Sequence, residues 1–105
     1  MRSMTTIKYY NGTGYGYFEL KDPAALFEES TQKQTKMFFK SVLQRSEEAV
    51  SIAGYMLGLI IDSLSELYTL ADIIEADPKH KRSELTKVQT RIKRLEKAKK
   101  LCQEV

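Results

Sequence analysis

Hydrophobic residues recur every three or four positions through the middle of the chain, which is the spacing of one face of an α-helix. Two such rows run side by side, and together they form an apolar arc wider than one neighbouring helix covers. The pattern therefore predicts a central helix near residues 47–76 with more than one packing partner. The first row contains Val50, Ala53, Leu57, Ile60, Leu64, Leu67, Ala71 and Ile74, and the second contains Ile52, Met56, Leu59, Leu70 and Ile73.

A narrower apolar row follows near the C-terminus and predicts a last helix near residues 80–103. A single row suits packing against one other helix. Asp77-Pro78 resembles a helix start, so only a short turn separates this helix from the central one. We therefore expect the last helix to return antiparallel along the central helix. The row contains Leu85, Val88, Ile92, Leu95, Lys99 and Cys102.

The N-terminal segment is rich in aromatic residues and contains the turn-forming sequence Asn11-Gly12-Thr13-Gly14. Asn-Gly suits the turn of a β-hairpin, but an irregular aromatic arm packed on the helices has the same composition. Both alternatives stay open for residues 1–22.

A first helix is predicted near residues 23–45. Asp22 is a favourable N-cap, and Pro23 suits the first helical position. Ser46 and the two glutamates after it resemble another helix start, so a turn and one continuous helix are both possible there. The fold class predicted is all-α, a small helical bundle or long antiparallel helical hairpin, with the helical domain spanning residues 23–105.

The length of 105 residues is typical of one domain. The single Cys102 excludes an internal disulfide, and the first residues contain no apolar secretory segment, so a cytoplasmic location is expected. The apolar run from Ala49 to Ile61 is too short to span a bilayer and is followed by Asp62 and Glu66. Membrane binding is therefore not expected.

The chain has few residues suited to catalysis or metal binding. His80 and Cys102 are the only residues of their types, and on one helix they would lie about 33 Å apart. One His and one Cys cannot complete a zinc site, and Asp62 and Glu66 are most simply a solvated acidic face. We therefore predict no enzyme activity, no metal and no cofactor.

The two glycines of the central helix suggest a packing role. Each Gly destabilises a helix by roughly 1 kcal/mol relative to Ala, and small residues at this spacing let another segment approach closely. We expect a neighbouring helix or a tyrosine of the N-terminal segment to fill the space beside Gly54 and Gly58. The apolar groove predicted to bind a partner consists of Ile52, Gly54, Met56, Gly58, Leu59, Leu70 and Ile73.

Charge divides the chain into an acidic part and a basic part. Residues 1–78 carry 7 Lys and Arg against 11 Asp and Glu, whereas residues 79–105 carry 10 against 3. Helical spacing places one basic row of the last helix on the side away from the central helix. A solvated face is its simplest interpretation, and the alternatives are contact with an acidic protein or a phosphate backbone. This row contains Lys87, Lys93, Arg94, Lys97 and Lys100.

These features favour a non-enzymatic protein-binding module that acts through a helical groove, as an adaptor, inhibitor or small chaperone. The wide apolar arc predicts that it binds another protein or forms a homo-oligomer. The alternative is a nucleic-acid-binding accessory protein that uses the basic C-terminal helix.

Overall fold

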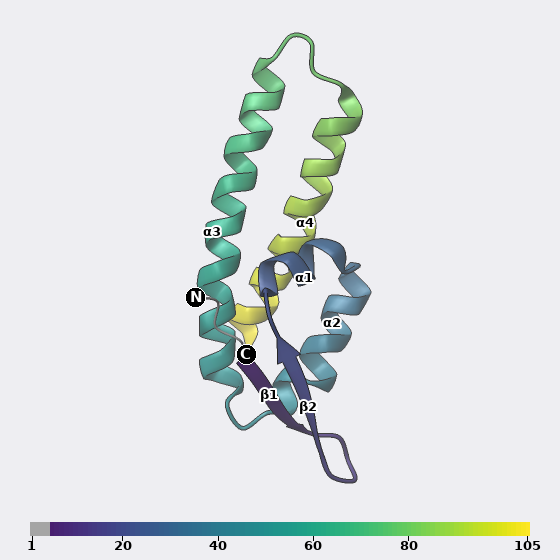
Figure 1. The fold of residues 1–105 in the computed structure, drawn as a ribbon, viewed down its shortest axis with the longest axis vertical. Coiled ribbons are helices and arrows are strands. Elements are labelled where there is room, and N and C mark those ends of the chain that lie inside the picture. Colours follow the sequence, from purple (N-terminus) through teal and green to yellow (C-terminus); the bar gives the residue numbers. More distant parts are fainter. Residues whose placement is uncertain (1–4) are drawn as a thin grey trace.

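The computed structural model describes residues 5–105, which are mostly helical (Figure 1). The fold is not purely all-α as predicted, because the N-terminal segment forms an antiparallel β-hairpin. In chain order the elements are β1 (Thr5–Tyr10), β2 (Tyr15–Leu20), α1 (Pro23–Glu29), α2 (Gln32–Ser41), the 3-10 turn η1 (Leu43–Arg45), α3 (Ala49–Ala76) and α4 (Arg82–Glu104).

The β-hairpin resolves the first open alternative. Its register pairs Thr5 with Leu20 and Tyr10 with Tyr15. The Asn11 side chain accepts hydrogen bonds from the backbone N–H groups of Thr13 and Gly14, both at 3.0 Å, and Gly12 adopts a φ of +103°. Asn-Gly therefore forms the tight turn expected of it.

The single helix expected over residues 23–45 is broken into α1, α2 and η1. Asp22 caps α1 as predicted, since its side chain accepts a hydrogen bond from the first turn. A second start follows at once: Thr31 Oγ1 accepts from the Gln34 N–H at 3.1 Å, and Gln34 Oε1 accepts from the Thr31 N–H at 2.9 Å. This capping box begins a new helix with a different direction.

The chain also turns between η1 and α3, which excludes one continuous helix through residues 45–48. Ser46 Oγ accepts a hydrogen bond from the Glu48 N–H at 3.2 Å and so stabilises this turn. The short turn expected at Asp77-Pro78 is present, but this pair does not cap the last helix. Asp77 ends α3 and accepts from the Lys79 N–H at 2.9 Å, whereas α4 begins after Lys81 without a side-chain cap.

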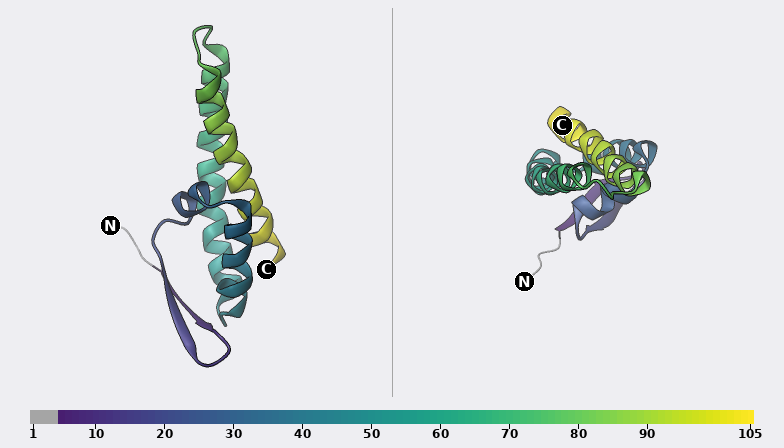
Figure 2. Two further views of the ribbon diagram at one scale, coloured as in Figure 1. Left: turned by 90° about the vertical axis from the view of Figure 1, so that its right-hand side faces the viewer. Right: turned by 90° about the horizontal axis from the view of Figure 1, so that it is seen from above.

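α3 and α4 form a long antiparallel hairpin whose two halves differ in their surroundings. The β-hairpin, α1 and α2 pack against one side of the half near the C-terminus, while the half near the α3–α4 turn projects beyond them (Figures 1 and 2). α1 contacts both long helices and α2 contacts α4. The resulting molecule measures 56 × 29 × 22 Å.

One hydrophobic core runs through the near half and narrows toward the turn. The β-hairpin contributes Ile7 and Leu20 to the same core as the helices, so the N-terminal segment packs with the helical part. In the far half the core lies between α3 and α4 alone. The buried core residues of the helices include Phe27, Phe39, Leu43, Ile52, Met56, Ile60, Leu64, Leu67, Val88, Leu95 and Cys102.

The first apolar row of α3 is confirmed except at its start, where Val50 is 74% exposed in the first turn. The second row divides in two. Ile52 and Met56 are buried where the core is complete, whereas Leu70 and Ile73 are exposed because no third element of residues 5–105 reaches the far half. The apolar row of α4 is buried at Val88, Leu95 and Cys102 and half-buried at Leu85, Ile92 and Lys99.

Candidate functional site

The apolar groove predicted on α3 does not form as one surface. Ile52 and Met56 lie in the intramolecular core, and Leu59 is half-buried. The other members are exposed but lie on different sides of α3, because twelve helical residues from Gly58 to Leu70 rotate the side chain by about 120°. The physical reason is that α1 packs against α3, so the near half of the second apolar row is buried in the common core.

The two glycines of α3 face open space. A Cβ built on Gly54 or Gly58 would have no neighbouring atom within 4 Å among residues 5–105, so the expectation that a helix or tyrosine fills this space is wrong. Val50 precedes Gly54 by four residues, and Ile61 follows Gly58 by three, so all four share one side of the helix. We call these four residues the open face of α3.

The two large residues of the open face were missed by sequence reasoning. Val50 is 74% exposed and Ile61 is 45% exposed. Val50 matched the spacing of the buried row, and only the position of α4 shows that it points away from the core. Large apolar side chains beside exposed glycines form a shallow surface that suits contact with another helix.

The exposed side of α3 carries negative charge only. Asp62 follows Gly58 by one helical turn, and Glu66, Asp72 and Glu75 are also exposed. No Lys or Arg occurs between Arg45 and Lys79. The open face therefore has an acidic border.

The basic row of α4 is only partly directed into solvent. Lys87, Lys93 and Lys100 are exposed and Lys97 is half-buried. Arg94 instead packs beside α1, so its assignment to the outward row is wrong.

Arg94 joins α4 to the end of α1. Its Nη1 donates a hydrogen bond to the backbone oxygen of Glu28 at 3.0 Å, and Arg91 Nη2 contacts the Glu28 carboxylate at 3.0 Å. Cations are favoured at a helix C-terminus because its last carbonyl groups lack helical partners. The two arginines therefore stabilise the docking of α1.

α2 contributes basic residues that sequence reasoning missed. Lys33, Lys36 and Lys40 follow helical spacing and are exposed, and α2 packs against α4. The available signal was the absence of any acidic residue between Glu29 and Glu47. That signal does not show which other helix lies beside it.

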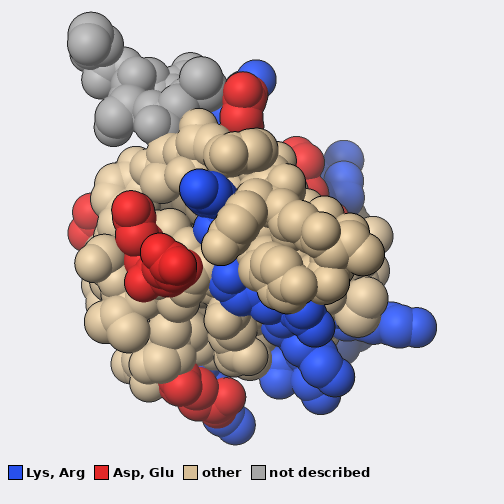
Figure 3. Space-filling model, turned by 90° about the horizontal axis from the view of Figure 1, so that it is seen from below, with Lys and Arg blue, Asp and Glu red and all other residues tan. Residues whose placement is uncertain are grey.

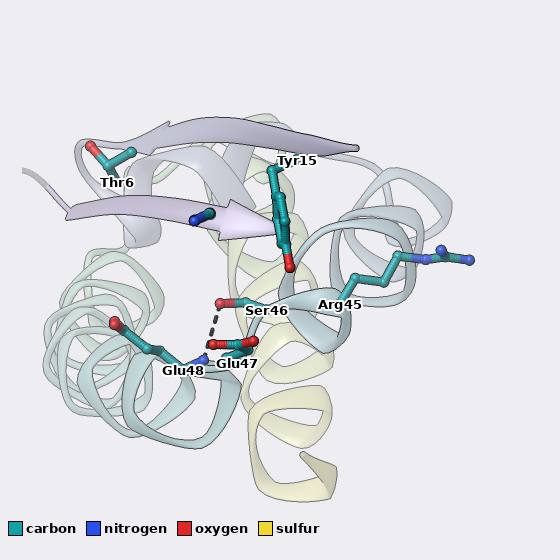
Figure 4. A pocket seen from close by; sticks show the side chains of 7 residues that line it. Thr6, Tyr15, Arg45, Ser46, Glu47 and Glu48 are labelled. Atoms are coloured by element: carbon teal, nitrogen blue, oxygen red, sulfur yellow. Dashed lines mark hydrogen bonds between the residues drawn. The ribbon is translucent and has the colours of Figure 1, made fainter. Parts of the chain in front are cut away.

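A small polar pocket of about 110 Å³ lies where the β-hairpin meets the start of α3 (Figure 4). Lys8 Nζ lies 4.5 Å from the ring centre of Tyr15, a cation–π contact. Ser46 is occupied by its turn-stabilising hydrogen bond to the Glu48 N–H, and the Arg45 side chain points away from the pocket. The pocket thus lies between the hairpin and the helices. Its lining residues do not include a nucleophile paired with a base.

The ionisable groups of α4 do not converge on one site. Burial raises the pKa of Cys102 to about 11, which keeps it a thiol. His80 lies far from Cys102, in the turn before α4, where its Nδ1 is 2.8 Å from the Asp77 backbone oxygen. The hydrogen bond from the Tyr68 hydroxyl to Glu96 raises the Tyr68 pKa. Within residues 5–105 no three His, Cys, Asp or Glu residues are grouped to hold a metal ion.

α3 is long and apolar enough to cross a membrane when judged by length and composition alone. The core helix of a soluble protein meets the same criterion, and α3 carries a buried face along the core. This helix therefore gives only weak evidence for membrane insertion.

Comparison with protein-family models, with curated proteins and with solved structures found no match to this chain.

Proposed function

We propose that the protein acts without catalysis by binding another protein through the open face of α3, as an adaptor, inhibitor or small chaperone. The observation that carries this proposal is the exposure of Val50 and Ile61 on either side of two glycines with open space above them. Apolar surface of this kind is stabilised when a partner removes it from water.

The shape of the open face favours a helix as the bound element. Gly54 and Gly58 have no side chains to hold a neighbour away, so the backbone of a partner helix can approach α3 closely. Val50 and Ile61 then lie beside the crossing point and bury their side chains against the partner. A crossing of this type needs no pocket.

The charge around the open face defines the partner further. Asp62 and Glu66 lie on the exposed side of α3, with no basic residue on the same helix. Opposite charges across an interface favour correct partners and disfavour like-charged ones. The bound helix is therefore amphipathic, with an apolar stripe between Lys or Arg residues.

Site-specific photo-crosslinking tests this proposal. A photoreactive amino acid replaces Ile61 in the full chain, which is expressed in its native host, and crosslinked peptides are identified by mass spectrometry. We expect one protein to be captured at a basic amphipathic helix. A purified peptide of that segment should then bind the unmodified chain, and Ile61→Arg should weaken its binding.

Ile73 provides the matched control because it is 62% exposed on the same helix but outside the open face. A photoreactive group at position 73 should not capture the same segment, and Ile73→Arg should leave peptide binding unchanged. Equal capture from both positions would contradict the proposal. Capture of a second copy alone would show self-association in place of binding to another protein.

A further inference from the structure

In the folded protein, basic side chains lie close together on the side of the molecule away from α3. α2 and η1 contain Lys33, Lys36, Lys40 and Arg45 without an acidic residue. Figure 3 shows Lys and Arg side chains gathered on one side of the end nearest the C-terminus, while most Asp and Glu lie elsewhere. This cluster of basic side chains results from the tertiary structure, because residues 1–78, which include α2, carry a net negative charge.

The basic side chains of this region form two short rows. The row on α2 spans eight residues, and a row of equal length lies on α4, so each extends about 10 Å along its helix. The two helices are in contact and run in the same direction (Figures 1 and 2). We call these six residues the lysine surface: Lys33, Lys36, Lys40, Lys93, Lys97 and Lys100.

No carboxylate within residues 5–105 forms an ion pair with the lysine surface. The ion pair of the described chain joins Arg91 to Glu28, and Glu96 of α4 is bound to Tyr68 on the α3 side. Clustered like charges destabilise a folded protein, and dissolved salt screens this repulsion. A polyanion would relieve the same repulsion upon binding.

The residue composition of the lysine surface indicates which kind of polyanion it binds. Protein interfaces have an apolar centre, but Met37 is the large exposed apolar residue of α2. Interfaces with nucleic acids are more polar and strongly positive. An unpaired base would need an exposed aromatic ring to stack on, but α4 contains no aromatic residue and the phenylalanines of α2 lie in or against the core. We propose that the lysine surface binds the phosphate backbone of a nucleic-acid duplex without reading its sequence.

Fluorescence anisotropy with short labelled duplexes of mixed sequence tests this second function. Separate DNA and RNA duplexes distinguish the two sources of the phosphate backbone. The double variant Lys33→Glu/Lys36→Glu should weaken duplex binding on the order of tenfold near physiological salt. It should also lower the slope of log affinity against log salt concentration by about 1.8, the contribution of two phosphate contacts.

The control variant Lys79→Glu/Lys81→Glu makes the same change in net charge at the α3–α4 turn, where both lysines are exposed. It should retain nearly full duplex affinity, while circular dichroism verifies that both variants are folded. Equal weakening by the two variants would overturn the proposal, because net charge alone would then explain binding. Absence of duplex binding at low salt would also overturn it, as would equally tight binding to polyglutamate or to anionic phospholipid vesicles.

A thermal unfolding series without nucleic acid provides a second readout. Added KCl should raise the melting temperature of the unmodified chain by screening the lysine surface. The increase should be smaller for Lys33→Glu/Lys36→Glu than for the control variant. A melting temperature that falls with salt in the unmodified chain would show that attractive ion pairs dominate and would count against the proposal.

Discussion

Replacement of Gly58 by Ala tests the exposure of the open face most directly. The added methyl group would meet no atom of another segment within 4 Å among residues 5–105, so neither a clash nor new packing changes the folded state. What remains is the gain in helix propensity, about 1 kcal/mol for an exposed Gly in a helix interior. Gly54→Ala should give a similar gain, for about 2 kcal/mol in the double variant.

Urea unfolding followed by circular dichroism at micromolar protein concentration measures this gain. In thermal unfolding, the same gain should raise the melting temperature by roughly 4–8 °C per substitution for a domain of this size. Gly12→Ala provides the contrast: it is also exposed with nothing within 4 Å, but its φ of +103° disfavours any side chain. It should destabilise the protein by about 1 kcal/mol. A loss of stability in Gly58→Ala would refute our assignment of an open face.

The remaining predictions concern the core. Leu64→Ala should lower the free energy of unfolding by about 2–5 kcal/mol in urea titrations, because Leu64 is buried between α3 and α4; an unchanged value would place it on the wrong face. Thr35 Oγ1 is buried without a hydrogen-bond partner in residues 5–105, so Thr35→Val should stabilise by about 1–3 kcal/mol, and a loss in the same titration would reveal a partner. Burial raises the Cys102 pKa from 9.0 to about 11. The protonated thiol therefore contributes about 1–3 kcal/mol to the free energy of unfolding below pH 9, and this contribution disappears as the pH rises through 11. Cys102→Ala should show a smaller alkaline loss in urea titrations, and identical pH profiles would exclude this origin.

Local patterns predicted the long helices well, because helical periodicity depends only on residues three or four positions apart in the sequence. The buried positions Leu64 and Val88 followed from spacing alone. The sequence did not decide between a β-hairpin and an irregular arm, since Asn11-Gly12 permits a turn but cannot show whether two strands pair. The break at Thr31 was visible as a capping box and was overlooked in favour of one long helix.

The candidate surfaces were harder to predict because they depend on contacts between distant segments. Spacing placed Arg94 away from α3, but only the fold shows that α1 ends there. Ile52 and Ile73 belong to the same apolar row, yet one lies in the core and the other in solvent. Likewise, the lysines of α2 and α4 become one surface only after the two helices pack.

The projecting half of the α3–α4 hairpin gives the molecule two levels of local stability. Each helix there has one neighbour, so opening the tip breaks few contacts and leaves the core near Phe27 intact. Amide hydrogens near Ile73 should therefore exchange through local opening, while those near Ile60 exchange only when the whole domain unfolds. The tip can separate and close again many times within the lifetime of the folded near half.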